Sequence, residues 1–252
     1  MFVDLFGGSG SVVLNTKAEH YIYNDIVPYV RDILEGISTE NIDDIIIFIK
    51  DLIAKHDLTK LNLDGFNELR SEYNNGFKDW KALYTLMCYS FDNQYRFNNA
   101  HQYNSSFGKN RSSYTDTTES KLKLAYDKLK QMDITFMASN FKDFDFSNFD
   151  NNDFVYCDPP YLNSIGNYND GKRGFEGWSN QYESELYSKL DQLHNQGCRF
   201  AVSNNISVNS SIQEWANKNG YTIHMLNNSY YNCCYNKKDK SNSDAEVLIT
   251  NY

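Results

Sequence analysis

The chain has 252 residues, of which 40% are hydrophobic and 15% aromatic, so it can bury the core of one large domain or of one domain with an insertion. No apolar run approaches the roughly 20 residues that a membrane helix needs, and no signal peptide is evident, which predicts a cytoplasmic protein without a membrane partner. The five cysteines are odd in number and lack CxxC spacing, so we expect reduced thiols and no metal site.

The net charge of −9 argues against a nucleic-acid partner, because phosphate binding needs a basic surface. The distribution of charge weakens that argument. Residues 93–113 contain no Asp or Glu but include Arg96, Lys109 and Arg111, and residues 237–240 carry three lysines. Both segments could equally be solvated loops, so the charge pattern alone leaves DNA binding open.

The amino-terminal pattern predicts a strand, a turn and a helix in quick succession. Residues 1–5 are typical of a short buried strand, residues 6–10 form a glycine-rich turn, and an amphipathic helix is expected from about Ser11. The glycines allow the backbone to approach a ligand closely. Such a turn taken alone is more often simple loop geometry than a cofactor site.

A second strand is predicted over residues 18–23, and Asp25 follows it. An acidic residue about 20 positions past a glycine turn is placed to accept hydrogen bonds from ribose hydroxyls. The alternative is that Asp25 caps a helix that starts at Val27.

A long helical block comes next. Apolar residues recur at helical spacing over residues 28–36, 41–56, 64–73, 78–91 and 119–132. A third strand is expected only at residues 134–138, and the block is too long for a simple crossover between neighbouring strands. We therefore predict a helical insertion.

Residues 153–161 contain a buried strand that ends at Asp158, where two prolines and Tyr161 stop it. The carboxyl ends of strands are where open α/β sheets bind their ligands. Proline has a carbonyl but no N–H, so this tip offers hydrogen-bond acceptors beside a flat ring. That combination suits an amino group on a planar base.

In the last third of the chain, predicted helices and strands alternate. We expect a mobile loop over residues 163–178, a helix capped by Ser179, a strand over 199–203, a helix over 207–218 and two final strands over 221–226 and 246–250 that pair as an antiparallel hairpin. The predicted fold is α/β: a Rossmann-like, doubly wound, mostly parallel sheet with an antiparallel C-terminal strand and a helical insertion domain.

Two stretches resemble motifs of a known family. Asp158-Pro159-Pro160-Tyr161 resembles the catalytic DPPY motif of methyltransferases that act on the amino groups of adenine, cytosine or glutamine, and residues 4–12 resemble their S-adenosylmethionine loop. Because the glycine loop comes first and a long insertion follows it, the order resembles that of the Dam-type (D12 class) DNA adenine N6-methyltransferases, including those of T-even phages.

The resemblance implies roles for particular residues. Catalysis would fall to Asp158, Pro159, Pro160 and Tyr161. The cofactor S-adenosyl-L-methionine would be bound by Asp4, Phe6, Gly7, Gly8, Ser9, Gly10, Asp25, Ile26, Phe141 and Asp158. Asp25 would hold the ribose and Ile26 the adenine, while Phe141 and the nearby Asp143 are equally well explained as a packed ring and a solvated loop acid.

Residues 91–99 and 107–111 resemble the family's DNA-recognition hairpin, although Ser106 stands where the family usually has proline. An arginine fork matches guanine and an asparagine amide matches adenine, whereas other basic residues usually contact phosphates. The candidate DNA contacts are Arg96 and Asn98 for bases, and Lys109 and Arg111 for the backbone.

The implied function is methyl transfer from S-adenosylmethionine to adenine N6 in double-stranded DNA, at a GATC-like site and by base flipping. Residues 1–35 and 134–252 would form the catalytic domain and residues 36–133 the target-recognition insertion. Cytosine N4 and glutamine are the nearest alternative targets. The family usually carries a G-x-K-x-x-L segment before the first strand, and this sequence starts at the strand, which leaves open an impaired homologue or one complemented by a separate N-terminal polypeptide.

Overall fold

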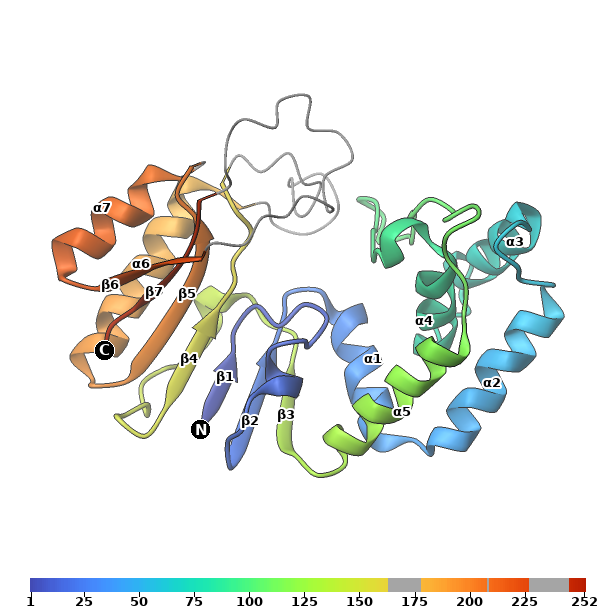
Figure 1. Cartoon of the computed structure of the whole chain (residues 1–252), viewed down its shortest axis with the longest axis horizontal. Coiled ribbons are helices and arrows are strands. Elements are labelled where there is room, and N and C mark those ends of the chain that lie inside the picture. Colours follow the sequence, from blue (N-terminus) through green and yellow to red (C-terminus); the bar gives the residue numbers. More distant parts are fainter. Residues whose placement is uncertain (163–177, 208, 227–244) are drawn as a thin grey trace.

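The computed structural model describes residues 1–162, 178–207, 209–226 and 245–252, and these contain one mixed sheet of seven strands in the order β3-β2-β1-β4-β5-β7-β6 (Figure 1). The strands are β1 (Phe2–Asp4), β2 (His20–Asn24), β3 (Asp133–Met137), β4 (Phe154–Cys157), β5 (Arg199–Asn205), β6 (Thr222–Leu226) and β7 (Glu246–Thr250). Strands β1 to β5 pair in parallel, and β7 lies antiparallel between β5 and β6. The predicted α/β fold with an antiparallel C-terminal strand is confirmed.

The strand register divides the sheet into two buried faces. Phe2 pairs with Phe154 and Val3 with Val155, so alternate residues of β1 and β4 point to opposite sides. The Phe2 face packs against the loop after β1 and the first helix, and the Val3 face packs against the last two helices. Helical elements therefore cover both faces, as in a doubly wound sheet.

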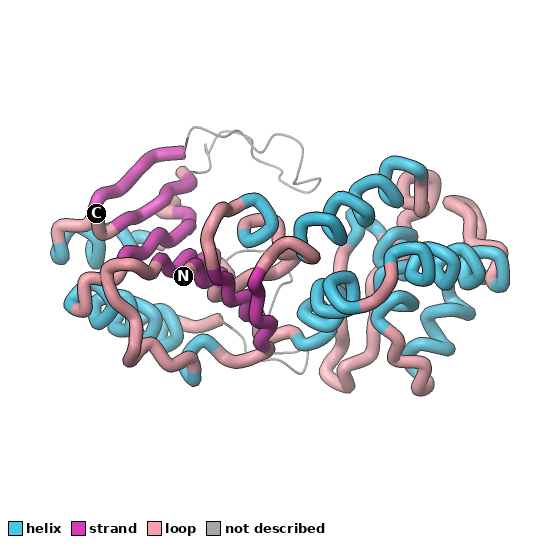
Figure 2. The backbone as a smooth tube through the Cα atoms, turned by 90° about the horizontal axis from the view of Figure 1, so that it is seen from below, coloured by secondary structure: helices cyan, strands magenta, loops and turns pink. Residues whose placement is uncertain are grey.

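The seven helices are α1 (Pro28–Thr39), α2 (Ile42–Lys55), α3 (Leu63–Asn74), α4 (Trp80–Tyr89), α5 (Asp116–Leu129), α6 (Asn180–Asn195) and α7 (Ser210–Asn219) within the described residues. Helices α2 to α5 gather beside the β3 edge of the sheet, at the opposite end of the molecule from β6 and β7 (Figures 1 and 2). These helices enclose a hydrophobic core of their own, and we call α2 to α5 together the helical body.

Helix α1 belongs to both parts of the molecule. Its Leu34 packs with the core on the sheet, whereas Ile33 and Ile37 pack with α2 to α5. The predicted division at residues 35 and 36 falls inside this helix. The assignment of residues 36–133 to a target-recognition insertion stays a prediction.

Local sequence signals account for several helix starts. The Asn41 side chain accepts hydrogen bonds from the amides of Asp43 and Asp44 at the start of α2. The predicted cap Ser179 accepts from the amide of Tyr182, 3.3 Å away, at the start of α6. Helix α7 begins at Ser210, later than predicted, because the Asn209 side chain caps it.

One predicted helix is wrong. In place of an amphipathic helix from Ser11, the chain makes a single 3-10 turn at Val13–Asn15. The side chains of Asn15 and Thr16 donate to the carbonyls of Ser11 and Val12, at 2.8 and 2.9 Å, so they compete with helix propagation. Two adjacent valines add little helix propensity, and β2 already begins at His20.

Some predictions concern residues that are not described. The loop expected at residues 163–178 lies almost wholly outside the described residues, as does the cluster of Lys237, Lys238 and Lys240. In the described ranges Cys88, Cys157 and Cys198 are buried free thiols, and no cluster of His, Cys, Asp or Glu is arranged to hold a metal ion. None of the described helices is long and apolar enough to cross a membrane.

Candidate active site

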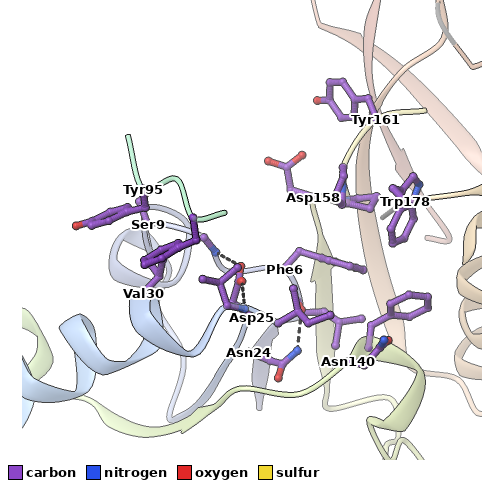
Figure 3. Close-up of a pocket in the computed structure, with 18 of the residues that line it drawn as sticks. Phe6, Ser9, Asn24, Asp25, Val30, Tyr95, Asn140, Asp158, Tyr161 and Trp178 are labelled. Atoms are coloured by element: carbon purple, nitrogen blue, oxygen red, sulfur yellow. Dashed lines mark hydrogen bonds between the residues drawn. The ribbon is translucent and has the colours of Figure 1, made fainter. Parts of the chain in front are cut away.

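A pocket of about 750 Å³ opens where the carboxyl ends of β1, β2, β3 and β4 meet (Figure 3). The segments that follow these four strands all contribute to its wall. The sequence predicts the ligand-binding residues at this same edge of the sheet. A side chain of β2, Asn24, ties the strand ends together, because its amide nitrogen donates to the carbonyls of Leu5 and Ser139, both at 3.0 Å.

The glycine turn after β1 has a fixed shape. Gly7 passes so close to the Tyr23 ring that an added Cβ would lie 2.2 Å from it, and the Tyr23 hydroxyl donates to the Gly8 carbonyl at 2.6 Å. Gly8 and Gly10 have positive φ angles of 48° and 75°. A Cβ added at Gly8 would meet no atom within 4 Å, so the backbone is open at this point. Of the predicted cofactor residues in this loop, Phe6, Gly8 and Ser9 line the pocket.

Asp25 holds the turn and the start of α1 together. One carboxylate oxygen accepts from the Gly8 amide at 2.9 Å and the other from the Val27 amide at 2.8 Å. Val27 is itself the N-cap of α1 and no side chain caps this helix, so the predicted capping by Asp25 is wrong. Asp25 and Ile26 both line the pocket. Burial raises the pKa of Asp25, whereas the two hydrogen bonds lower it by a smaller amount.

Asp4 lies at the end of β1 and is only 1% exposed. One of its oxygens accepts from the Val13 amide at 3.2 Å, and the other, Oδ1, has no hydrogen-bond partner. Burial raises its pKa to about 7, with a smaller contribution from the negative charges of Asp158 and Asp25. Asp4 is not part of the pocket wall, so its contact with a cofactor stays a prediction.

Asp158 projects from the end of β4 into the pocket, with Tyr161 beyond it (Figure 3). Water reaches the carboxylate, yet the concave wall removes much of its hydration, and this burial raises its pKa to about 6. The nearby charge of Glu246 on β7 acts in the same direction. Pro159, Pro160 and Tyr161 line the same pocket, so the structure brings all four predicted catalytic residues together with the glycine turn.

An aromatic cluster forms the side of the pocket next to α6. The rings of Phe6, Phe141 and Trp178 lie 5.4 to 5.6 Å apart, centroid to centroid. Phe141 is both a packed aromatic and a pocket residue, whereas Asp143 is exposed and outside the pocket wall. In the sequence Trp178 is only the last residue of the loop predicted before the helix capped by Ser179. Its ring contacts depend on a fold that brings distant segments together.

The segment from Asp92 to Phe97 also lines the pocket, which the sequence did not predict. It lies in an irregular hairpin joined by the bridges Ser90–Phe107 and Phe97–Tyr103. Phe97 stacks on Tyr29 of α1 with a centroid distance of 4.4 Å, which fixes the hairpin beside the sheet. Figure 3 places Tyr95 on the Ser9 side of the pocket. We call residues 90–107 the hairpin.

The four predicted DNA contacts have different surroundings. Arg96 lines the pocket, and its buried Nε has no hydrogen-bond partner. The Asn98 amide holds the hairpin turn, since its oxygen accepts from Ala100 and Gln102 amides and its nitrogen donates to the Gln102 side chain. Lys109 is exposed. Arg111 is exposed too, 3.3 Å from the Asp92 carboxylate and over the Phe91 ring. Contacts of all four with DNA stay predictions.

The comparison with known proteins agrees with these motifs. The profile of the family described as "D12 class N6 adenine-specific DNA methyltransferase" matches residues 1–238. The Type II methyltransferase M.FokI of Planomicrobium okeanokoites is 42% identical, and the modification methylase StsI of Streptococcus sanguinis is 38% identical, each over the whole of this chain and 39% of the relative. The DNA adenine methylase of Haemophilus influenzae is 29% identical over 63% of this chain and 54% of the relative.

The chain thus spans about two fifths of the length of M.FokI and StsI. The family profile covers nearly all of it, including the glycine turn, the helical body and the DPPY tetrapeptide. The chain belongs to the family of D12 class N6 adenine-specific DNA methyltransferases.

Proposed function

We propose that this protein transfers a methyl group from S-adenosylmethionine to N6 of adenine in double-stranded DNA. The observation that carries the proposal is that Asp158, Pro159, Pro160 and Tyr161 line the same pocket as Gly8, Ser9 and Asp25. An acceptor-rich tip and a glycine turn then face one space, in which a base and a cofactor can meet. The Type II and modification methylases among the relatives suggest a role in restriction and modification.

The pocket fits the proposed cofactor. Its volume of about 750 Å³ is typical of a site for a small organic ligand. The open space at Gly8 lets a ligand approach the turn closely, and the Asp25 carboxylate has lone pairs that can accept from ribose hydroxyls. The aromatic cluster offers flat surfaces to an adenine ring. The carboxylates of Asp25 and Asp158, which line the pocket, suit a ligand with positive charge. When bound, S-adenosylmethionine supplies an electrophilic methyl group on a sulfonium.

The residues of β4 would prepare the target amino group. The exocyclic nitrogen of adenine is a poor nucleophile because its lone pair is delocalised into the ring. The Asp158 carboxylate and the carbonyl of Pro159 or Pro160 would accept its two N–H groups, so that the nitrogen becomes pyramidal and directs its lone pair into the pocket. Asp158 contributes most as an ionised acceptor in a partly desolvated site, where electrostatic interactions are strong.

Adenine inside a duplex cannot reach this pocket, so the target base would have to be flipped out and stacked on Tyr161. We propose that the helical body with its hairpin recognises the flanking sequence, with Arg96 as a base reader, Lys109 and Arg111 on phosphates, and a GATC-like site as target. Such a reaction takes place in the cytoplasm of a bacterial or phage-infected cell.

The test is methyl transfer from labelled S-adenosylmethionine to duplexes that contain GATC, compared with duplexes in which the adenines of that site are replaced. Asp158→Ala should abolish transfer while the melting temperature stays close to that of the parent protein, because the side chain is exposed. The matched control is Asp143→Ala, an exposed acid outside the pocket, which should leave the rate unchanged. Undiminished transfer by Asp158→Ala would overturn the mechanism.

A further inference from the structure

Helix α6 carries a buried carboxylate. Glu183 is only 2% exposed, although it lies in the first turn of the helix, where acidic side chains usually face water. Burial of a charge is costly unless hydrogen bonds replace its hydration. Both oxygens of Glu183 are accordingly surrounded by donors from three segments of the chain.

The donors form a network. One oxygen, Oε1, accepts from the indole Nε1 of Trp178 at 3.2 Å and from the Asn209 amide at 2.9 Å. The other, Oε2, accepts from the Tyr187 hydroxyl and the Asn209 amide, both at 2.7 Å, and from the Ser211 hydroxyl at 3.4 Å. Glu183 thus joins the starts of α6 and α7 to one pocket residue, Trp178.

Trp178 contributes its indole N–H to this network. It precedes the cap Ser179, so its backbone lies outside the hydrogen-bonded turns of α6. Its ring contacts Phe6 and Phe141 with centroid distances of 5.6 and 5.4 Å and forms part of the pocket wall. Ring packing alone allows an indole to slide or tilt, whereas a directional bond from Nε1 to a fixed carboxylate sets its plane.

We propose that Glu183 is a positioning residue for cofactor binding: it holds the Trp178 ring in the aromatic wall that receives the adenine of S-adenosylmethionine. This inference rests on the proposed function. Glu183 does not line the pocket, so its influence on the cofactor passes through Trp178. Loss of the Glu183 acceptor should therefore weaken cofactor binding and leave the chemical step at Asp158 nearly unchanged.

The chain offers a matched control for the structural role of the same carboxylate. Tyr187 donates to Oε2 and stacks on Trp215 at 4.5 Å, and neither ring lines the pocket. Tyr187→Phe removes a hydrogen bond from Glu183 without touching Trp178. Glu183→Gln keeps the shape of the side chain but replaces an acceptor oxygen by an N–H donor, which opposes the surrounding donors.

The experiment compares the two variants by calorimetric titration with S-adenosylmethionine, by steady-state kinetics and by thermal unfolding. Glu183→Gln should raise the cofactor Kd and KM about tenfold, the effect of one charge-assisted hydrogen bond, with kcat changed less than about twofold. Tyr187→Phe should lower the melting temperature but leave Kd within about twofold. Adding Trp178→Phe to Glu183→Gln should cost little more than Trp178→Phe alone, because both act through one contact.

A Kd for Glu183→Gln equal to that of the parent protein would overturn the proposal, and so would an equal rise for Tyr187→Phe. A second measurement does not need the cofactor. In a background of Trp80→Phe and Trp215→Phe, quenching of Trp178 fluorescence by acrylamide should increase on Glu183→Gln and stay constant on Tyr187→Phe. If the parent protein bound no cofactor, the proposed function would fail, while unchanged quenching would refute the link between Glu183 and Trp178 itself.

Discussion

Asp158 lies where one side of its carboxylate meets water and the other meets the pocket wall, so its charge is sensitive to neighbouring residues. Burial, followed by the charge of Glu246, raises its pKa from 3.8 to about 6. The proposed mechanism needs the ionised form, because a carboxylate accepts a stronger hydrogen bond from the amino group than a protonated carboxyl group does. Protonation below about pH 6 should therefore reduce catalysis.

We predict that kcat/KM falls as the pH is lowered through about 6. Glu246→Gln removes a negative charge near Asp158, so the pKa of Asp158 should fall and the acidic limb should move to lower pH. The measurement is the pH profile of methyl transfer for both proteins. Glu214→Gln on the exposed side of α7 is the control and should keep the parent profile. An acidic limb that does not move in Glu246→Gln would contradict this electrostatic coupling.

Asp4 gives a prediction for stability. Burial raises its pKa from 3.8 to about 7, so between these values the folded protein binds a proton that the unfolded chain releases. The free energy of unfolding should therefore fall as the pH rises through this window, and the penalty is complete above it. A shift of this size is worth a few kcal/mol at most.

Asp4→Asn keeps the shape of the protonated side chain and removes the titration. We expect it to raise the melting temperature at about pH 8 by several degrees more than at about pH 5, as measured by calorimetry at both values. Glu214→Gln should show no such difference. A gain that is equal at the two pH values would mean that Asp4 is not the group that titrates.

At the scale of single elements, the sequence predicts what is decided locally. Asn41 and Ser179 cap helices through bonds to amides two or three residues ahead, and the helix starts follow from those residues. The turn at Val13–Asn15 was missed because Asn15 and Thr16 bond their own backbone, which a pattern of apolar residues does not show. Glu183 was missed for a related reason, since an acid near a helix start normally indicates an exposed cap.

In the hairpin, a residue predicted to contact DNA has a structural role. Asn98 was predicted to read a base, yet its amide holds the turn. We predict that Asn98→Ala weakens binding to all duplexes to a similar degree, because it disturbs the hairpin.

Arg96→Ala should instead weaken binding to the preferred site by about 1 to 3 kcal/mol and leave other sequences almost unaffected. Competition binding with matched and mismatched duplexes separates these outcomes, and a sequence-specific loss in Asn98→Ala would restore its role as a base reader.

At the scale of the whole molecule, the pocket belongs to two parts of the chain. The sheet provides the ends of four strands, and the hairpin adds Asp92 to Phe97 from more than sixty residues away from either motif. The motifs predicted the sheet side of the pocket, because the carboxyl ends of parallel strands meet at one edge. The hairpin side could not be predicted, since it depends on how α1 packs and on the stack of Tyr29 on Phe97.

This arrangement predicts that the cofactor stabilises the hairpin as well as the glycine turn. A ligand that contacts both the glycine turn and the hairpin would lose those contacts whenever either one opened. Local opening of either segment should therefore be rarer when the ligand is bound. Amide exchange should slow at Gly7 and Gly10, and also at Arg96 and Asn104, whose amides are bonded within the hairpin. The slowing could reach about 100-fold at a cofactor concentration of about 100 times Kd.

The measurement is hydrogen–deuterium exchange with and without S-adenosylmethionine, in the absence of DNA. The amides of α7, which lies beside β6 and far from the hairpin, serve as the internal control and should change much less (Figure 1). Protection in both walls would mean that cofactor binding stabilises the hairpin before DNA arrives, so that the proposed recognition hairpin and the proposed catalytic residues share one folded unit. Protection confined to the glycine turn would mean that the bound cofactor leaves the hairpin free, and recognition would then have to act on the site through the DNA alone.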